Sequence, residues 1–187
     1  MATKTAYLAQ AVGSAEAAAI MGIHFTQPRR MVEKGLLTAY QPPMSLYTDS
    51  PSRRVAIYDG GECAANYEAY DEKCLARGGK INSRPREWVH TRPEALRHLK
   101  AVKTPIAFKD AIGMAEAAQI LQVHESLIPR MVASGKIIGR RPWNPRGIGG
   151  SRIYILSRES CQANVRETKS REAAGKKPGR KRSRKVS

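Results

Sequence analysis

The stretch AVGSAEAAAIMGIHFTQPRRMVEKG at residues 11–35 returns in altered form as AIGMAEAAQILQVHESLIPRMVASG at residues 111–135. The two stretches align without a gap at an offset of 100 residues, and 12 of the 25 aligned positions are identical. Similarity over this length indicates that one structural unit is duplicated within the chain.

The similarity resumes after a variable segment in each copy. Arg54–Ile57 aligns with Arg152–Ile155, and Cys63–Asn66 aligns with Cys161–Asn164, now at an offset of 98 residues. A change in length confined to one segment predicts that this segment is a surface loop. Short apolar runs before the loop and alternating residues after it predict two strands that flank a wing.

Each copy is expected to begin with a helix and a tight turn. Ser14 is a favourable N-cap for the first helix, and the alanines behind it are strong helix formers. The repeated His24 and His124 fall in the turn, where we expect backbone groups rather than a metal to satisfy them. Asp59 and Ser157 can cap a closing helix in the two copies.

A second helix follows the turn, and two prolines locate its start. Pro28 and Pro129 would each break a helix interior, but proline is tolerated in a first turn. Taking Thr26 and Ser126 as the N-caps satisfies this rule in both copies. A repeated glycine is then expected to end each second helix in the left-handed conformation, at Gly35 and Gly135.

The predicted order of elements is helix, turn, helix, strand, wing, strand and helix, and it occurs twice. This order predicts a mainly α fold with small β wings, within the α+β class. We expect a first winged helix-turn-helix in residues 1–77, a linker with a short helix in 78–104, a second winged helix-turn-helix in 105–165, and a basic tail in 166–187.

The linker and the tail have distinct signals. The spacing of Thr91 and Glu94 is that of a capping box, which predicts a short helix that is either a strut between the copies or packs on one of them. The tail is rich in Lys and Arg with almost nothing to bury, so we expect disorder and contacts with phosphates. The tail residues expected to contact DNA are Lys176, Lys177, Arg180, Lys181 and Arg182.

The charge of the chain limits its partners. Lys and Arg number 33 against 16 Asp and Glu, a net charge of +17, which indicates a polyanionic partner, nucleic acid first. A membrane partner is not expected, because no apolar run is long enough to span a bilayer. No paired acid–base residues, phosphate loop or nucleophile elbow is present, and the three cysteines match no zinc spacing. We therefore expect no enzyme activity, no cofactor and no metal.

A family resemblance adds to this interpretation. The pattern E-A-A-x-x-[ML]-x-[IV], followed by a helix ending in [RM]-V-x-x-G-x-[LI], resembles the excisionase-type winged helix-turn-helix, which is related to the MerR-like regulators. The resemblance covers about two thirds of the chain. It implies that the second helix enters the major groove of DNA and that the wing touches the minor groove or the backbone. It also implies a cytoplasmic, nucleoid-associated protein of a bacterial phage, plasmid or integrative element.

The residues expected to contact DNA lie in the second helices and the wings. A recognition helix reads bases near its N-terminus, where Gln27 suits adenine and Arg29 or Arg30 suits guanine. The second copy has only Arg130 there, beside the acidic Glu125, so its wing arginines are expected to read groove shape instead. The full set is Thr26, Gln27, Arg29, Arg30, Arg53 and Arg54 in the first copy, and Ser126, Arg130, Arg140, Arg141, Arg146 and Arg152 in the second.

The sequence thus predicts a sequence-specific double-stranded DNA-binding protein that reads an asymmetric or direct-repeat site as one chain. A monomer is expected to suffice, because the tandem copies supply both readers. The resemblance implies a transcriptional regulator or repressor, or an excisionase-like factor, with a recombinase or RNA polymerase as a further partner. Two alternatives stay open: an architectural protein that bends, coats or partitions DNA with little base preference, and a packaging factor resembling a terminase small subunit.

Overall fold

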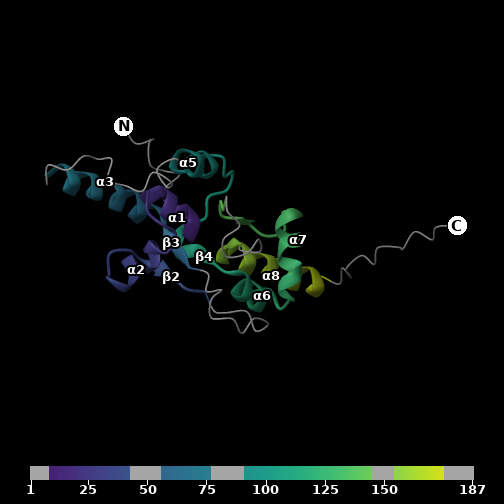
Figure 1. Ribbon diagram of the computed structural model, residues 1–187. Coiled ribbons are helices and arrows are strands. Elements are labelled where there is room, and N and C mark those ends of the chain that lie inside the picture. The colour runs from purple at the N-terminus through teal and green to yellow at the C-terminus, as the bar shows by residue number, and fades with distance from the viewer. Residues whose placement is uncertain (1–8, 43–55, 77–90, 145–153, 175–187) are drawn as a thin grey trace.

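The computed structural model of the chain describes residues 9–42, 56–76, 91–144 and 154–174 (Figure 1). Within these ranges the fold is mixed α+β, with two three-stranded antiparallel sheets surrounded by helices. This arrangement agrees with the α+β class predicted from the sequence. Most of the two segments predicted to be wings, and the chain after residue 174, lie outside the described residues.

The first copy builds a strand, two helices, two strands and a closing helix. Its elements are β1 (Ala11–Gly13), α1 (Ser14–Met21), α2 (Gln27–Glu33), β2 (Ala39–Tyr40), β3 (Ile57–Asp59) and α3 (Gly60–Ala76). The central strand is β3, since Val12 of β1 and Ala39 of β2 both pair with Tyr58 in antiparallel register. Val12 and Tyr58 are buried, so the sheet forms one wall of the first copy's core.

The second copy repeats this order. Its elements are the 3₁₀ turn η3 (Phe108–Asp110), β4 (Ala111–Ile112), α6 (Met114–Leu121), the 3₁₀ turn η4 (Glu125–Leu127), α7 (Ile128–Ala133), β5 (Gly139–Arg140), β6 (Ile155–Ser157) and α8 (Arg158–Ala173). The central strand is β6, where Ile112 and Gly139 both pair with Leu156. Cys63 of α3 and Cys161 of α8 are buried free thiols at equivalent places in the closing helices.

The sequence pattern does not predict β1 and β4, the first strand of each sheet. Each has only two or three residues, too few for a strand alternation to be recognised. Both are edge strands, and β1 is supported by a segment far along the chain: the backbone nitrogen of Ala11 donates to the carbonyl oxygen of Ile106 at 2.7 Å. Long-range pairing therefore stabilises an element that has no local signal.

The ends of the first two helices of the first copy follow the predicted rules with one exception. Thr26 holds the N-cap position of α2, as predicted, although its hydroxyl makes no capping hydrogen bond, and Gly35 follows α2 with a left-handed φ of +68°. The prediction of Ser14 as the N-cap of α1 is wrong, because Gly13 takes that position. The Glu16 carboxylate accepts a hydrogen bond from the Gly13 nitrogen at 2.9 Å, which is the bond that the acidic third residue of a helix makes in a capping box.

In the second copy, the predicted N-cap of the second helix is also wrong. Leu127 rather than Ser126 precedes α7, because the 3₁₀ turn η4 comes between the interhelical turn and the helix. Pro129 still falls in the first turn of α7, as proline requires. Gly135 has a φ of +69° and ends the helical segment, as predicted.

The closing helices have the predicted caps. Asp59 Oδ1 accepts from the backbone nitrogen of Gly61 at 2.8 Å, and Ser157 Oγ accepts from the nitrogen of Ser160 at 3.0 Å. A side-chain oxygen that satisfies an unpaired N–H of the first turn stabilises a helix start. Both helices therefore begin at positions set by the local sequence.

The closing helix α8 continues through Ala173, so the prediction that a disordered tail begins at residue 166 is wrong for residues 166–173. The composition of residues 166–173 gives no reason for order, because the segment is polar and charged. In the structure its residues are exposed, so burial does not hold it either. A helix that is already nucleated adds residues at little cost, however, and Glu167 and Arg171 form an i,i+4 ion pair along it.

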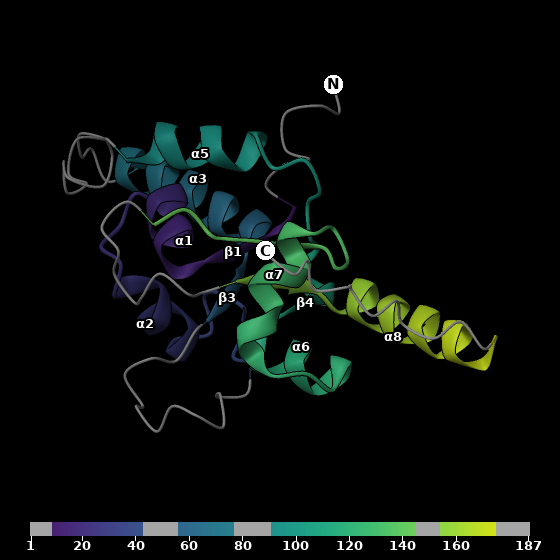
Figure 2. The same ribbon diagram turned by 90° about the vertical axis from the view of Figure 1, so that its right-hand side faces the viewer.

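The predicted linker helix exists as α5 (Arg92–Lys100) and packs on the first copy. Ala95 and Leu99 are buried, and Leu99 belongs to the core that α1 and β3 form. Arg92 Nε also donates to the carbonyl oxygen of Ile20 in α1 at 2.9 Å. Figures 1 and 2 both place α5 alongside α1, so this helix is part of the first copy and not a free strut.

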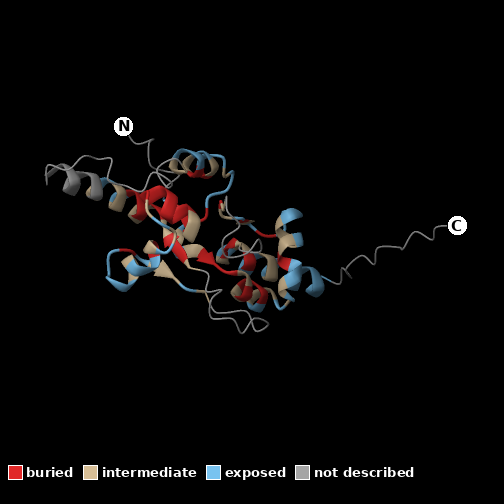
Figure 3. Ribbon diagram, in the orientation of Figure 1, coloured by how far each residue is buried: buried red, intermediate tan, exposed pale blue. Residues whose placement is uncertain are grey.

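Each copy has its own apolar core, and a third cluster lies between the copies. The first core is centred on Val12, Ile20 and Tyr58, and the second on Ile112, Ile128 and Leu156. The third joins residues of both sheets and of the segment before β4: Ala11, Ile57, Ile106, Ala111 and Ile155, all of them buried. Figure 3 shows this buried centre continuing from one copy into the other.

We expect Gly135→Ala to lower the free energy of unfolding by about 1–2 kcal/mol, the cost of a Cβ in the left-handed conformation. Nothing lies within 4 Å of a Cβ built at this position, so the effect isolates the backbone term. Urea unfolding followed by circular dichroism measures it. Gly135→Asn is the matched variant and should lose less, since Asn tolerates this conformation. Equal losses in the two variants would contradict the assignment.

Candidate nucleic-acid interface

The second helix of each copy has one buried residue, and its other residues are partly or fully exposed. Pro28 is the one buried residue of α2, and Ile128 is the one buried residue of α7. A methionine and a valine on the inner face of each helix are partly buried and pack against the core of their own copy. They are Met31 and Val32 in α2, and Met131 and Val132 in α7. Each helix is thus held by one face, and Figure 3 shows its remaining surface in the exposed and intermediate colours.

The predicted base-reading residues of the first copy lie together on α2 and its N-terminal side. Thr26, Arg29 and Arg30 are exposed, and Gln27 is partly exposed. Arg29 Nε lies 3.3 Å from Glu33 Oε1, with 65% of the arginine side chain exposed. An ion pair at such an exposed position is weak and screened by salt, so it can be exchanged for a phosphate or a base.

The equivalent surface of the second copy is less basic. Ser126 and Arg130 are exposed, but Glu125 precedes them, and Leu127 adds an apolar side chain that is 39% exposed. A carboxylate at the start of a helix would repel phosphate. The second copy therefore presents less positive charge at this surface than the first, as the sequence indicates.

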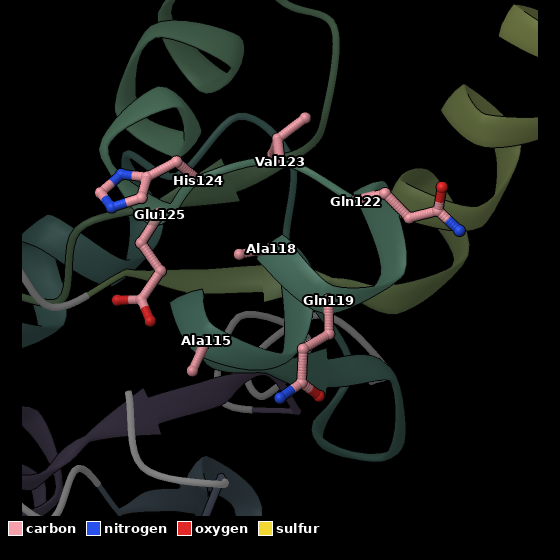
Figure 4. A pocket seen from close by; sticks show the side chains of 7 residues that line it. All are labelled: Ala115, Ala118, Gln119, Gln122, Val123, His124 and Glu125. Atoms are coloured by element: carbon pink, nitrogen blue, oxygen red, sulfur yellow. The ribbon is translucent and has the colours of Figure 1, made fainter. Parts of the chain in front are cut away.

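An open pocket of about 270 Å³ lies beside the turn between α6 and α7 (Figure 4). Its polar wall includes Gln119, Gln122 and His124, and Glu125 stands at its rim. His124 Nδ1 accepts from the backbone nitrogen of Ser126 at 3.2 Å, and its counterpart His24 does the same for Thr26 at 3.4 Å. Both histidines therefore hold the turn through backbone contacts, as predicted.

Among the predicted DNA-contacting residues, Arg140 is placed in the interior, and its prediction as a wing contact is wrong. Its side chain is 8% exposed, and it donates from Nη1 to Glu16 Oε1 at 2.6 Å and from Nη2 to Glu16 Oε2 at 2.9 Å. Nη2 also donates to the carbonyl oxygen of Ala11 at 2.5 Å. An arginine beside a wing would normally face solvent, but here the other copy supplies a buried carboxylate.

The residues that follow Arg140 divide between the surface and the interior. Arg141 is exposed, with its guanidinium carbon 5.3 Å from the centre of the Tyr154 ring, so it stays available at the base of the predicted wing. Trp143 is 9% exposed and packs with Ala19 of α1 and Ala95 of α5. The start of the segment predicted to be the second copy's wing is therefore anchored on the first copy.

The remaining predicted contacts lie outside the described residues. They are Arg53 and Arg54 of the first wing, Arg146 and Arg152 of the second wing, and Lys176, Lys177, Arg180, Lys181 and Arg182 of the tail. They stay predictions from the sequence.

Sequence reasoning missed Glu16 and Glu116, two residues that organise the contact between the copies. Glu16 is fully buried, and besides Arg140 its carboxylate accepts from the backbone nitrogens of Gly13 and Trp143, the latter at 2.7 Å. Glu116 accepts from the Tyr40 hydroxyl and lies 2.7 Å from Arg158 Nη2. An identical acidic residue in the first turn of each alanine-rich helix was the available signal.

The surroundings of Glu16 keep it ionised. Burial alone raises the pKa of this carboxyl, but the contacts from His98 and Arg140, the positive charge of Arg140 and the Trp143 nitrogen outweigh burial. The pKa of Glu16 is consequently below its ordinary value of 4.5. A buried carboxylate with a bidentate arginine is a fixed structural contact rather than a site for a ligand.

Comparisons with protein-family models, with curated proteins and with solved structures gave no match to this chain. In the part of the chain that the structure describes, no helix combines the length and the apolar character needed to cross a bilayer. Within the same residues, no three His, Cys, Asp or Glu side chains gather in a group that could hold a metal ion.

We expect Glu16→Gln to lower the free energy of unfolding by about 3–5 kcal/mol near neutral pH, because it leaves the Arg140 guanidinium buried without a counter-charge. The folded-state pKa of Glu16 is depressed, so its stabilisation is fully present above about pH 4.5 and is lost as the pH falls through the folded-state pKa. The urea midpoints of the wild type and the variant should therefore converge once the pH is below the folded-state pKa of Glu16.

The matched control is Glu33→Gln, which removes a carboxylate that is 61% exposed. Its urea midpoint should stay close to that of the wild type at every pH. A Glu16→Gln deficit that does not change with pH would contradict the account of the buried ion pair.

Proposed function

We propose that this chain is a sequence-specific double-stranded DNA-binding protein that carries two winged helix-turn-helix readers in one polypeptide. The helices α2 and α7 are the proposed recognition helices. The observation that carries the proposal is the solvent-facing surface of α2, where Arg29 and Arg30 are exposed next to Thr26 and Gln27. Such a set combines phosphate neutralisation with side chains suited to base edges.

The local geometry supports this assignment. In each copy, a first helix is followed by a tight turn held by a histidine, and the second helix packs only its inner face on the core. That arrangement leaves a helix surface which can enter a major groove without unfolding the core. The three-stranded sheet ends at the segments expected to form the wings, which would then contact the adjacent minor groove or backbone.

The biological role that fits is a transcriptional regulator or repressor, or an excisionase-like factor of a mobile element. These roles share one mode of DNA binding and differ in the protein that is recruited, either a recombinase or RNA polymerase. Each copy has its own core, and the apolar cluster between them joins the two copies. One chain therefore carries both proposed readers, which supports binding by a monomer.

A second candidate function is architectural, in which the protein coats or bends DNA with little base preference. The observation that favours it is the net charge of +17, since phosphate contacts alone give strong, salt-dependent binding. The ratio of specific to non-specific affinity separates the two functions. A site reader is expected to reach a ratio of roughly 10³ or more at physiological salt.

Arg30→Ala is expected to weaken binding to a duplex selected from random sequence by about tenfold or more, because a guanidinium that reads guanine discriminates by ~1–3 kcal/mol. Arg97→Ala is the matched control: Arg97 is an exposed arginine on α5, which lies across α1 from α2 in Figures 1 and 2. The affinity of the Arg97→Ala variant for the selected duplex should change little.

Fluorescence anisotropy with the selected duplex and with a scrambled duplex measures both variants. The expected result for Arg30→Ala is a selective loss on the selected duplex. Equal losses for Arg30→Ala and Arg97→Ala on both duplexes would instead support the architectural function, in which any basic side chain contributes through its charge alone.

A further inference from the structure

The contacts between the two copies are reciprocal. Glu16 of the first copy binds Arg140 of the second, and the equivalent Glu116 of the second copy binds Tyr40 of the first, at the position that corresponds to Arg140. When residue i of one unit meets residue j of the other and the reverse also holds, the interface is isologous, and the units are related by a two-fold axis.

A second pair of contacts obeys the same rule at a different place. A Cβ built on Gly13 would lie 2.7 Å from Cβ of Pro142, and a Cβ built on Gly113 would lie 2.7 Å from Cβ of Pro42. Residues 13 and 113 are equivalent in the repeat, and so are residues 42 and 142. Close approach of the same two positions from both sides requires the same relation between the copies.

The cluster between the copies also contains matched residues. Ala11 and Ala111 both belong to it, as do Ile57 and Ile155, which are equivalent at the offset of 98. In Figure 1 the equivalent helices lie on opposite sides of this centre: α1 at upper left and α6 at lower right, α2 at left and α7 at right, with α3 and α8 extending outward in opposite directions.

We infer that the two copies form an intrachain pseudo-dimer, and that its target is a pair of inverted, non-identical half-sites at one fixed spacing. This inference rests on the proposed function. A two-fold rotation leaves the height along its axis unchanged, so α2 and α7 lie at the same height along the axis, as two readers of one duplex must. Readers related by a two-fold axis match half-sites related by a dyad, whereas a direct repeat needs readers related by translation.

The half-sites differ because the readers differ. Gln27 and Arg29 of the first copy correspond to Leu127 and Pro129 of the second, and Arg30 and Arg130 are shared. The first half-site is therefore expected to carry more base information, and the common arginine is expected to read the same base in both halves. The spacing is fixed because Glu16 is buried in the interface and Arg140 spans the copies, which resists their reorientation.

The test begins with selection of the full chain on random duplex DNA. Four probes are then made from the selected sequence: the sequence itself, one with the second half-site reversed into a direct repeat, one with about five base pairs inserted, half a helical turn, and one with about ten inserted. We expect the reversed and half-turn probes to bind about tenfold or more weakly. The full-turn probe should lose less than the half-turn probe, since both half-sites again face the same side of the duplex.

Gly113→Ala tests the interface itself, because its new Cβ must displace Pro42 and shift one copy against the other. We expect the penalty of the half-turn insertion to shrink in this variant while the circular dichroism spectrum stays that of a folded chain. Arg97→Ala, at an exposed position on α5, is the control and should keep the full penalty.

The outcomes separate the two proposals. Selection that enriches no sequence would overturn the proposed function, and the inference with it. A selected site made of direct repeats, or equal affinity for the reversed or half-turn probe, would overturn the pseudo-dimer target alone and leave the DNA-binding function in place.

Discussion

The structure depends on one buried carboxylate. Glu16 lies in the first turn of α1, caps its own helix through the Gly13 nitrogen, and receives the Arg140 guanidinium from the second copy. A buried ion pair repays its desolvation only if its geometry is good and its remaining oxygen atoms are hydrogen bonded, and here the Trp143 nitrogen contributes the further contact. The same side chain therefore fixes a helix end and the position of one copy against the other.

Because the copies share an interior, the relative position of the proposed readers is a property of the fold rather than of a linker. Flexible tandem modules gain affinity through effective concentration and accept variable spacing. The cluster of Ala11, Ile57, Ala111 and Ile155 replaces that freedom with packed side chains. The helix α5, which could have been a spacer, instead buries Leu99 in the core of the first copy.

Divergence between the copies is uneven in a way that follows from location. The partly buried inner positions of the second helices keep their residues, as at Met31 and Met131, whereas the fully buried position changes from Pro28 to Ile128. The interface keeps its carboxylates but changes their partners, a tyrosine in one place and an arginine in the other. The outer surfaces of α2 and α7 share Arg30 and Arg130 but differ at the other exposed positions, and the proposed readers differ there.

The sequence by itself determined what depends on neighbours along the chain: the duplication, the caps at Asp59 and Ser157, the glycine stops and the exposed second helices. It could not assign Arg140, because an arginine in a basic loop appears solvent-facing until a carboxylate 124 residues away is placed beside it. The edge strands β1 and β4 had no readable pattern for a related reason, as β1 is held by pairing with β3 and by a hydrogen bond from Ala11 to Ile106. Burial and long-range pairing arise only when distant segments meet, so the tertiary structure alone decided how the two copies join.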